Sequence, residues 1–219
     1  MRQNVSLAEI SDGHLYKAND MVKADCGGCE GCSQCCRGMG SSIILDPYDV
    51  YRLTTGIDKS MQELLATSVE LNVVDGVILP NLKMQGTEET CVYLDAEGRC
   101  SIHPYRPGIC RLFPLGRHYE NGGLFYFLQT GECAKENRSK VKVSKWIDTP
   151  ELKRNEQFKL QWHDLLSAMT DRVAGEDEGK QREENLLLLR LFYLLPYEGT
   201  TDFYSQFTER MEHWNEQIG

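Results

Sequence analysis

The sequence has no hydrophobic run long enough to cross a membrane. A membrane-spanning helix needs about 20 consecutive apolar residues, whereas the longest strongly apolar stretch, 186–195, is interrupted by Arg190. No apolar signal segment follows Met1, and the chain opens with polar residues. We therefore expect no transmembrane helix and a cytoplasmic location.

Positive charge is also scarce. The chain has 24 Lys and Arg residues against 33 Asp and Glu residues, which gives a formal net charge of −9. A protein with this charge repels phosphate backbones at long range, so binding to nucleic acid would need a strong local basic patch. Only residues 135–145 come close, and a solvent-exposed basic segment explains them more simply. We expect no nucleic-acid partner.

Cysteine is present throughout the first part of the chain but is unevenly placed. Nine cysteines in 219 residues make about 4%, which is below the level of small disulfide scaffolds. Five of them lie between Cys26 and Cys36, and none follows Cys133. An odd number of crowded thiols in a reducing compartment favours metal binding over a disulfide framework.

The first cysteine segment has the spacing of a metal-binding loop. Its thiols recur every three residues from Cys26 through Cys29 and Cys32 to Cys35, and Cys36 follows directly. Thiolates separated by two residues can chelate one metal from a tight turn, and the intervening glycines allow such turns. Because neighbouring side chains diverge, we expect one member of the Cys35–Cys36 pair to point away from a shared ion.

Part of this segment also has the spacing of a bacterial ferredoxin. That spacing runs from Cys26 to Cys36, but Arg37 stands where the ferredoxin pattern has proline, and no second copy of the run occurs. We therefore do not expect a ferredoxin.

Four further cysteines are spread along the chain at Cys91, Cys100, Cys110 and Cys133. They lie too far apart to form a local site, but they can join the first segment if the chain folds over it. The result would be one polynuclear cluster or two metal centres. As isolated residues, Cys91 and Cys133 would instead be small buried hydrophobic side chains.

Arginine accompanies the later cysteines, because every Lys or Arg position within 91–133 is an arginine. Four thiolates around a divalent ion or a [4Fe–4S] core leave about two negative charges, which guanidinium groups can offset while donating hydrogen bonds. We therefore predict that Arg106 and Arg111 bind the cofactor, with ordinary surface contacts as the alternative. A lone histidine in a turn, His103, is expected to be structural rather than a ligand or proton donor.

These motifs resemble a known family. The CxxCxxCC run at 29–36, followed by Cys91-Val-Tyr-Leu-Asp, Cys100-Ser-Ile-His and Arg106-Pro107 with Cys110-Arg111, is similar to the YkgJ-like cysteine-cluster proteins. That family is described as a zinc- or iron-chelating domain, and its members are commonly described as iron–sulfur proteins. The similarity covers about residues 26–133. It extends to the cluster domain of flagellin lysine N-methylase, a larger protein thought to need an iron–sulfur cluster.

The resemblance implies a set of metal ligands. By motif position the family's cysteines are Cys29, Cys32, Cys35, Cys36, Cys91, Cys100 and Cys110, with Cys133 as a later and less regular member. Cys26 lies outside the usual pattern and can replace one of the clustered thiols. The helices after residue 150 are not covered by the resemblance.

The patterning predicts an α+β fold with a small, irregular, cysteine-rich core. Asp46-Pro47 marks the start of a helix that closes at Gly56, and Ser60 with Glu63 predicts a second helix over 60–71. Short hairpins are expected at 73–79 and 91–100, and a strand at 124–128.

The last part of the chain differs in character because it contains no cysteine. Its periodicity predicts three amphipathic helices, at about 151–173, 181–195 and 201–217. We therefore expect a cysteine-cluster metal-binding domain over 1–148 and a helical segment over 149–219 packed on it. A protein or redox partner is expected to bind through these helices.

The preferred function is that of an iron–sulfur protein with a [4Fe–4S] cluster. Zinc is the alternative cofactor, but a structural zinc site rarely needs eight or nine thiols. A zinc-stapled interaction module and a cluster-dependent protein-modifying enzyme, like the flagellin methylase, are the alternative functions. The chain lacks the CxxxCxxC run of radical enzymes and a glycine-rich nucleotide loop. The sequence assigns no catalytic residue and no oligomeric state.

Overall fold

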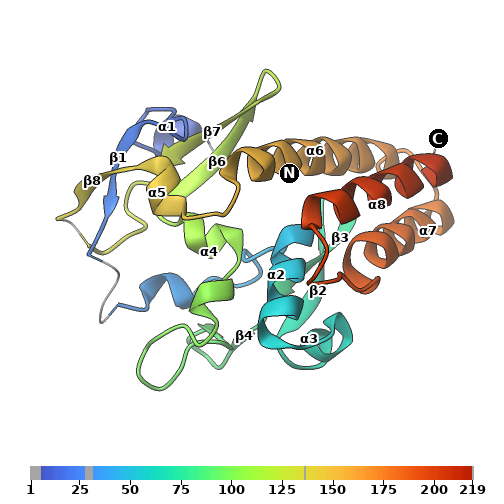
Figure 1. Ribbon diagram of the computed structural model, residues 1–219, viewed down its shortest axis with the longest axis horizontal. Coiled ribbons are helices and arrows are strands. Elements are labelled where there is room, and N and C mark those ends of the chain that lie inside the picture. The colour runs from blue at the N-terminus through green and yellow to red at the C-terminus, as the bar shows by residue number, and fades with distance from the viewer. Residues whose placement is uncertain (1–5, 28–31, 136, 219) are drawn as a thin grey trace.

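The computed structural model describes residues 6–27, 32–135 and 137–218 (Figure 1). The first half contains α1 (Leu7–Ile10), β1 (Met21–Asp25), the 3-10 turn η1 (Gln34–Cys36), α2 (Pro47–Ile57), α3 (Met61–Thr67), β2 (Val69–Val74), β3 (Val77–Leu82), β4 (Met84–Gln85) and β5 (Thr90–Cys91). The second half contains η2 (His103–Tyr105), α4 (Gly108–Leu112), β6 (Leu115–Glu120), β7 (Gly123–Leu128), β8 (Ser139–Lys142), α5 (Val143–Ile147), α6 (Leu152–Val173), α7 (Glu178–Leu189), the π-helical turn η3 (Arg190–Leu194) and α8 (Phe203–Ile218). The fold is α+β, as predicted.

The strands of the described residues form antiparallel pairs rather than one continuous sheet. The pairs are β1 with β8, β2 with β3, β4 with β5, and β6 with β7. In Figure 1 the first and last of these pairs lie at one end of the molecule, and β2 and β3 lie among the helices at the other. Helix α4 lies between the two ends, so a short cysteine-bearing helix sits where they meet.

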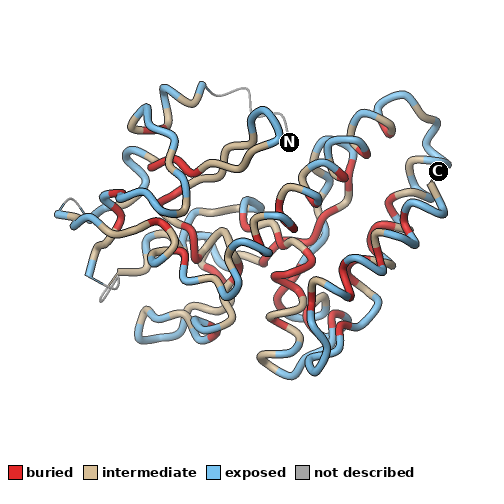
Figure 2. Tube along the Cα trace, turned by 45° about the horizontal axis from the view of Figure 1, so that its top comes forward, coloured by how far each residue is buried: buried red, intermediate tan, exposed pale blue. Residues whose placement is uncertain are grey.

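Two hydrophobic clusters hold the fold together, and Figure 2 shows the buried segments of both. The larger one joins α2, β2 and β3 to the C-terminal helices. Phe158 of α6 lies at its centre, with its ring edge-on to Phe203 and Phe207 of α8 at centroid distances of 5.1 and 4.7 Å. Such aromatic pairs stabilise a core beyond the area they bury. The smaller cluster includes Leu112 of α4 and Tyr126 of β7.

Local signals placed several elements correctly. Helix α2 begins at Pro47 after the N-cap Asp46, and β2 and β3 form the hairpin around Asp75-Gly76. The three C-terminal helices are confirmed to within a few residues, although the second one runs into the π-helical turn η3. No helix among the described residues is long and apolar enough to cross a bilayer.

Two predictions were wrong in extent. The helix expected over 60–71 ends at Thr67, because the β-branched Val69 starts a strand that pairs with Leu82. Residues 91–100 do not form a hairpin of two strands, since Cys91 pairs with Met84 and a single bridge joins Leu94 to Cys100. The division between residues 148 and 149 stays a prediction.

A buried ion pair links the C-terminal helices to α2. The Lys159 side chain is 4% exposed, and its Nζ contacts the carboxylate of Asp46. Asp46 also caps α2, because its Oδ1 accepts the amide of Asp49 at 3.0 Å. Burial lowers the pKa of Lys159 to about 7, so the charged ammonium depends on its carboxylate partner. The pair therefore couples the position of α6 to the start of α2.

The contribution of this pair can be measured with Asp46→Asn, which retains a good N-cap and removes the charge facing Lys159. We expect the free energy of unfolding to fall by about 3 kcal/mol, because an unpaired buried charge is costly. Urea denaturation would measure the loss. Ser60→Ala, which removes the N-cap of α3 at an exposed position, should cost about 1 kcal/mol.

The double variant Asp46→Asn with Lys159→Met completes the comparison. It should recover most of the stability lost in Asp46→Asn, because no unpaired charge remains. Similar losses in Asp46→Asn and Ser60→Ala, with no recovery in the double variant, would show that the ion pair contributes little.

Candidate metal centre

Five thiols from separate segments of the chain lie within electrostatic range of one another. They are Cys35 and Cys36 of η1, Cys91 of β5, Cys100 in the loop that follows β5, and Cys110 of α4. We call these residues the five-thiol cluster. Four of them, Cys36, Cys91, Cys100 and Cys110, also contact the larger hydrophobic core. The cluster is thus built into the fold and does not lie on a surface loop alone.

Backbone pairing brings η1 against β5. Arg37 forms an antiparallel bridge with Thr90, and the Arg37 guanidinium donates to the Glu88 carboxylate at 2.8 Å and to Thr90 Oγ1 at 3.1 Å. Since Cys36 precedes Arg37 and Cys91 follows Thr90, this bridge sets the two thiols opposite each other. The next residue, Gly38, has φ +66°, a conformation that favours glycine, and donates its amide to the carbonyl of Glu89 at 3.1 Å.

The loop after β5 folds back, so that Cys100 lies near Cys91. Its ends are joined by the bridge between Leu94 and Cys100 and by the amide of Ser101, which donates to the carbonyl of Tyr93 at 2.8 Å. The chain then passes through η2, where the Tyr105 ring lies so close to Gly56 of α2 that a Cβ would find no room. This contact fixes the approach of the chain to α4.

Helix α4, which carries Cys110, is held in place by a buried carboxylate from α2. Asp49 is 2% exposed, and its Oδ1 accepts the amide of Gly108, the first residue of α4, at 2.7 Å. Burial raises the pKa of Asp49 to about 6, although this hydrogen bond and the charge of Arg117 both act to lower it. The sequence analysis missed Asp49. Its helix-start position was the available signal, but that position does not reveal a contact 59 residues away.

The thiols within the cluster are electrostatically unequal. The hydrogen bond from Cys36 and the charge of Arg106 lower the pKa of Cys35 to about 7, against the effect of burial. The same hydrogen bond, together with burial, raises the pKa of Cys36. The two adjacent thiols therefore contact each other, and the expectation that one of them points away from a shared ion stays a prediction. Cys35 is the thiol closest to the thiolate form that metals bind.

Crowding of the remaining thiols also opposes their ionisation. Burial and the nearby sulfurs of Cys35, Cys91 and Cys100 raise the pKa of Cys110. Burial is also the main reason that the pKa values of Cys91 and Cys100 are raised. A cation placed among these sulfurs would remove their mutual repulsion, which is the usual electrostatic basis of thiolate ligation.

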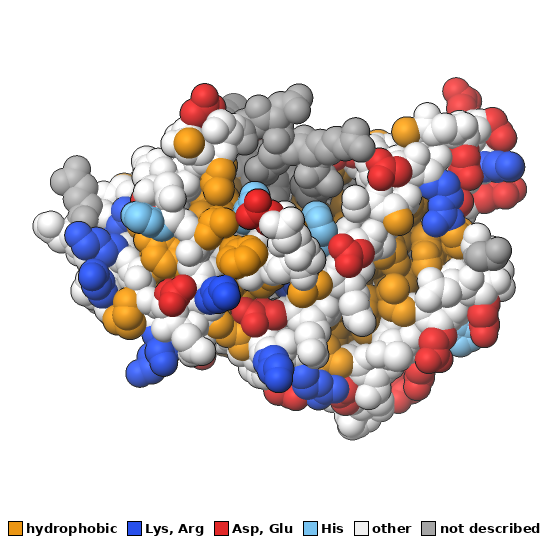
Figure 3. All heavy atoms as spheres, turned by 90° about the horizontal axis from the view of Figure 1, so that it is seen from above, with side chains coloured by type: hydrophobic (Ala, Val, Ile, Leu, Met, Phe, Trp, Pro, Cys, Tyr) orange, Lys and Arg blue, Asp and Glu red, His pale blue; other side chains and the backbone are white. Residues whose placement is uncertain are grey.

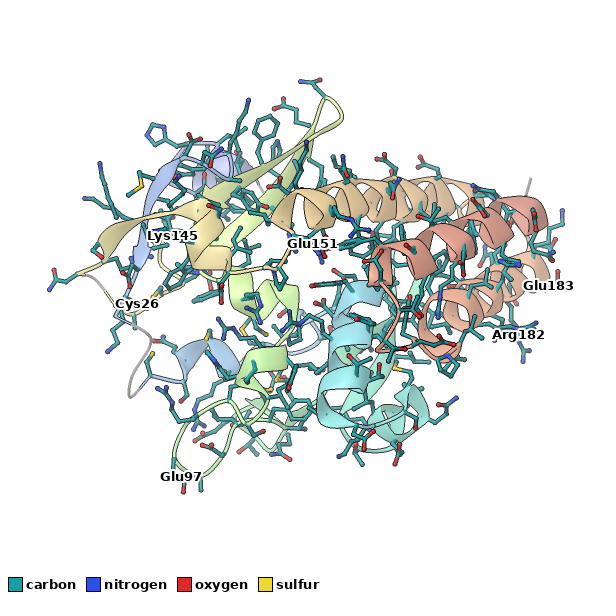
Figure 4. The ribbon with its side chains drawn as sticks, viewed as in Figure 1. Cys26, Glu97, Lys145, Glu151, Arg182 and Glu183 are labelled. Atoms are coloured by element: carbon teal, nitrogen blue, oxygen red, sulfur yellow. The ribbon has the colours of Figure 1, made fainter. Side chains whose placement is uncertain are left out.

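The other cysteines of the predicted set are placed differently. Cys26 follows β1 and lies toward the edge of the molecule in Figure 4, Cys32 precedes η1, and Cys133 follows β7. Neither Cys32 nor Cys133 is named among the residues that shift the pKa values of the five thiols. Cys29 lies outside the described residues. The structure brings the distant cysteines together with Cys35 and Cys36, at the end of the first segment.

The two predicted cofactor arginines have different surroundings. Arg106 acts on the thiols, since its positive charge favours the thiolate forms of Cys35 and Cys100. For Cys100 the effect of burial is larger, and its pKa stays raised. Its Nη1 also contacts the ring of His103, with 2.9 Å to Nδ1. Arg111 is 7% exposed and donates to the backbone carbonyls of Pro104 and Asp148, both at 2.8 Å. Arg106 therefore acts on the thiols, whereas Arg111 holds the nearby backbone in place through these two hydrogen bonds.

The donor set of the cluster suits soft metals, because it consists of sulfur alone. Among the described residues, no three Cys, His, Asp or Glu side chains are grouped tightly enough to hold one metal ion. Thiolates around a single zinc ion all lie about 2.3 Å from it, whereas those of a polynuclear cluster are distributed over several irons. The sulfur-only donor set is therefore compatible with zinc and with an iron–sulfur cluster.

Comparison with known proteins identifies the cysteine-bearing part of the chain. A family model named CxxCxxCC, with the description "Putative zinc- or iron-chelating domain", matches residues 28–140. The matched range contains every cysteine except Cys26, the one that the motif comparison left outside the usual pattern. No curated protein and no solved structure matches the chain.

Two single substitutions test whether the distant thiols are ligands. Cys110→Ser should lower the metal content per chain by at least half, because it removes a sulfur from the centre of the cluster. Cys133→Ser, a matched change outside the cluster, should leave the metal content unchanged. Elemental analysis of anaerobically purified protein measures both. Loss of metal in Cys133→Ser with full retention in Cys110→Ser would contradict the five-thiol cluster.

Proposed function

The chain belongs to the CxxCxxCC family of zinc- or iron-chelating domains, and from this membership we propose that it is an iron–sulfur protein. The proposed cofactor is a [4Fe–4S] cluster held by thiols of the five-thiol cluster. The observation that carries the proposal is the mutual interaction of sulfurs from distant segments of the chain. Several thiolates with no other donor type among them suit an iron–sulfur cluster.

The proposed ligands are Cys35, Cys91, Cys100 and Cys110. Cys35 supports this choice because its charge acts on each of the other three thiols. The fifth thiol, Cys36, is hydrogen-bonded to Cys35. We assign Cys36 the role of a donor to a ligand sulfur, because hydrogen bonds to cluster sulfurs are one of the means by which proteins set the reduction potential.

The surroundings of the thiols agree with a redox role. When bound, a [4Fe–4S] cluster supplies a one-electron couple whose potential depends on burial and on neighbouring charge. Here the sulfurs contact the hydrophobic core on one side and face Arg106 on the other. A positive charge beside the thiolates stabilises the more negative, reduced state. The chain's residues thus supply ligands, partial exclusion of water and one counter-charge.

Metal and sulfide analysis tests this proposal. Protein purified without oxygen should contain about four irons and four acid-labile sulfides per chain, as expected for one [4Fe–4S] cluster. It should also give an electron paramagnetic resonance signal after reduction. One zinc per chain with no sulfide would overturn the proposal and support the alternative, a zinc-stapled module.

A second prediction concerns the reduction potential. Arg106→Gln should lower the potential by about 60 mV, roughly a tenfold change for a one-electron couple, because it removes positive charge beside the thiolates. Arg99→Gln, on the turn of the 91–100 loop, is the matched control and should shift the potential much less. Potentiometric titration measures both. Equal potentials in Arg106→Gln and the unmodified protein would contradict the assigned role of Arg106.

A further inference from the structure

A narrow cleft of unusual charge lies where α2, α4 and α6 meet, next to the five-thiol cluster. Its walls carry five cationic side chains and one carboxylate: Arg52, Arg106, Arg111, Arg117, Lys159 and Asp49. The chain as a whole is acidic, and Figure 3 shows acidic side chains gathered around the end formed by the C-terminal helices. A concentration of positive charge in the interior of such a protein calls for an explanation.

The carboxylates near the cleft do not neutralise it. Both oxygens of Asp49 accept backbone amides, from Gly108 at 2.7 Å and from Asp46 at 3.2 Å. The Asp46 carboxylate is engaged by Lys159, and Arg111 has a carboxylate oxygen no closer than 3.7 Å.

Three of the cleft arginines have no ionic partner in the part of the chain that the structure describes. No carboxylate there lies within 4.0 Å of the guanidinium nitrogens of Arg52, Arg106 or Arg117. The cleft therefore holds more positive than negative charge.

One donor in the cleft is also unsatisfied. The buried Nε of Arg52, a residue that lines the cleft, has no hydrogen-bond partner among the described residues, although the Nη2 of the same side chain donates to the carbonyl of Pro104. Buried donors are nearly always satisfied in folded proteins. This donor is therefore available to an acceptor that enters the cleft.

A counter-charge for the metal centre does not account for these groups. Arg106 is the arginine whose charge acts on the thiols of Cys35 and Cys100. Arg52 and Arg117 also line the cleft and are not among the charges named as acting on those two thiols, but both act on Asp49. The single charge of Asp49 can offset only one of these two arginines.

We propose that this cleft binds one small oxyanion, the carboxylate or phosphate group of a ligand, beside the metal centre. Guanidinium groups suit this ligand because their paired N–H donors match two oxygens of a carboxylate or phosphate. The cleft is small, with a volume of about 240 Å³ including its open mouth. It therefore takes a single anionic group at the mouth and leaves the rest of the ligand outside.

The proposal rests on the residues of the cleft and not on which metal the thiols hold. It deepens the proposed function by giving the protein a place for an anionic substrate or effector next to its cofactor. Metal content is measured on every sample used below. If the unmodified protein carries its full metal content but binds no anion, the cleft proposal fails while the proposed function stands.

Calorimetric titration of the metal-loaded, full-length protein tests the site. Inorganic phosphate and acetate are titrated separately, and we expect saturable binding of at least one with a 1:1 stoichiometry. Tighter binding of phosphate would assign a phosphorylated ligand, and tighter binding of acetate a carboxylate. Arg117→Gln and Arg52→Gln should each weaken the binding at least tenfold, whereas Arg99→Gln, outside the cleft, should change it less than twofold.

A chemical measurement on the unmodified protein keeps the test valid if a variant fails to fold. The preferred anion should slow the modification of Arg52 and Arg117 by phenylglyoxal, as followed by mass spectrometry, and should leave Arg99 unaffected. Absence of binding by both anions would overturn the proposal. Equal weakening in Arg99→Gln and Arg117→Gln, or equal protection of all three arginines, would also overturn it.

Discussion

The metal centre depends on one hydrogen bond between the Asp49 carboxylate and the backbone amide of Gly108. This bond fixes the start of α4, and therefore the position of Cys110, relative to α2 and the hydrophobic core behind it. The carboxylate is buried, and burial raises its pKa to about 6, so loss of this bond would leave a buried acceptor without one of its partners. The neighbouring contact of Asp46 with Lys159 extends the same link to α6.

Charge organises the region around that bond. The thiols oppose one another's ionisation, and Arg106 counteracts part of this repulsion. Arg52, Arg111 and Arg117 lie close enough to Asp49 for their charges to lower its pKa against the effect of burial. A metal centre and an anion cleft can share a wall in this arrangement, because Arg106 lines both. Such proximity is what a cofactor requires if it is to act on a bound ligand.

Much of the fold could be predicted because its signals are local. The capping residues of α2, the Asp75-Gly76 turn and the periodicity of α6 all lie within the elements they specify. The grouping of the thiols could not be predicted in this way. Cys36 meets Cys91 through a bridge between Arg37 and Thr90, and Cys110 is set by Asp49. These contacts join residues more than fifty positions apart, and short-range spacing carries no information about them. The regular spacing of the first segment identified its thiols as candidate ligands, but it could not show that Cys35 and Cys36 meet the distant thiols.

The central claim is that cysteines distant in sequence form the metal site together. Anomalous diffraction from crystals of anaerobically prepared, metal-loaded protein tests it most directly, because it locates the metal and its ligands at once. We predict anomalous scattering centred among the sulfurs of Cys35, Cys91, Cys100 and Cys110. Metal bound only by cysteines of the 26–36 segment, with Cys91, Cys100 and Cys110 present as free thiols, would contradict the claim.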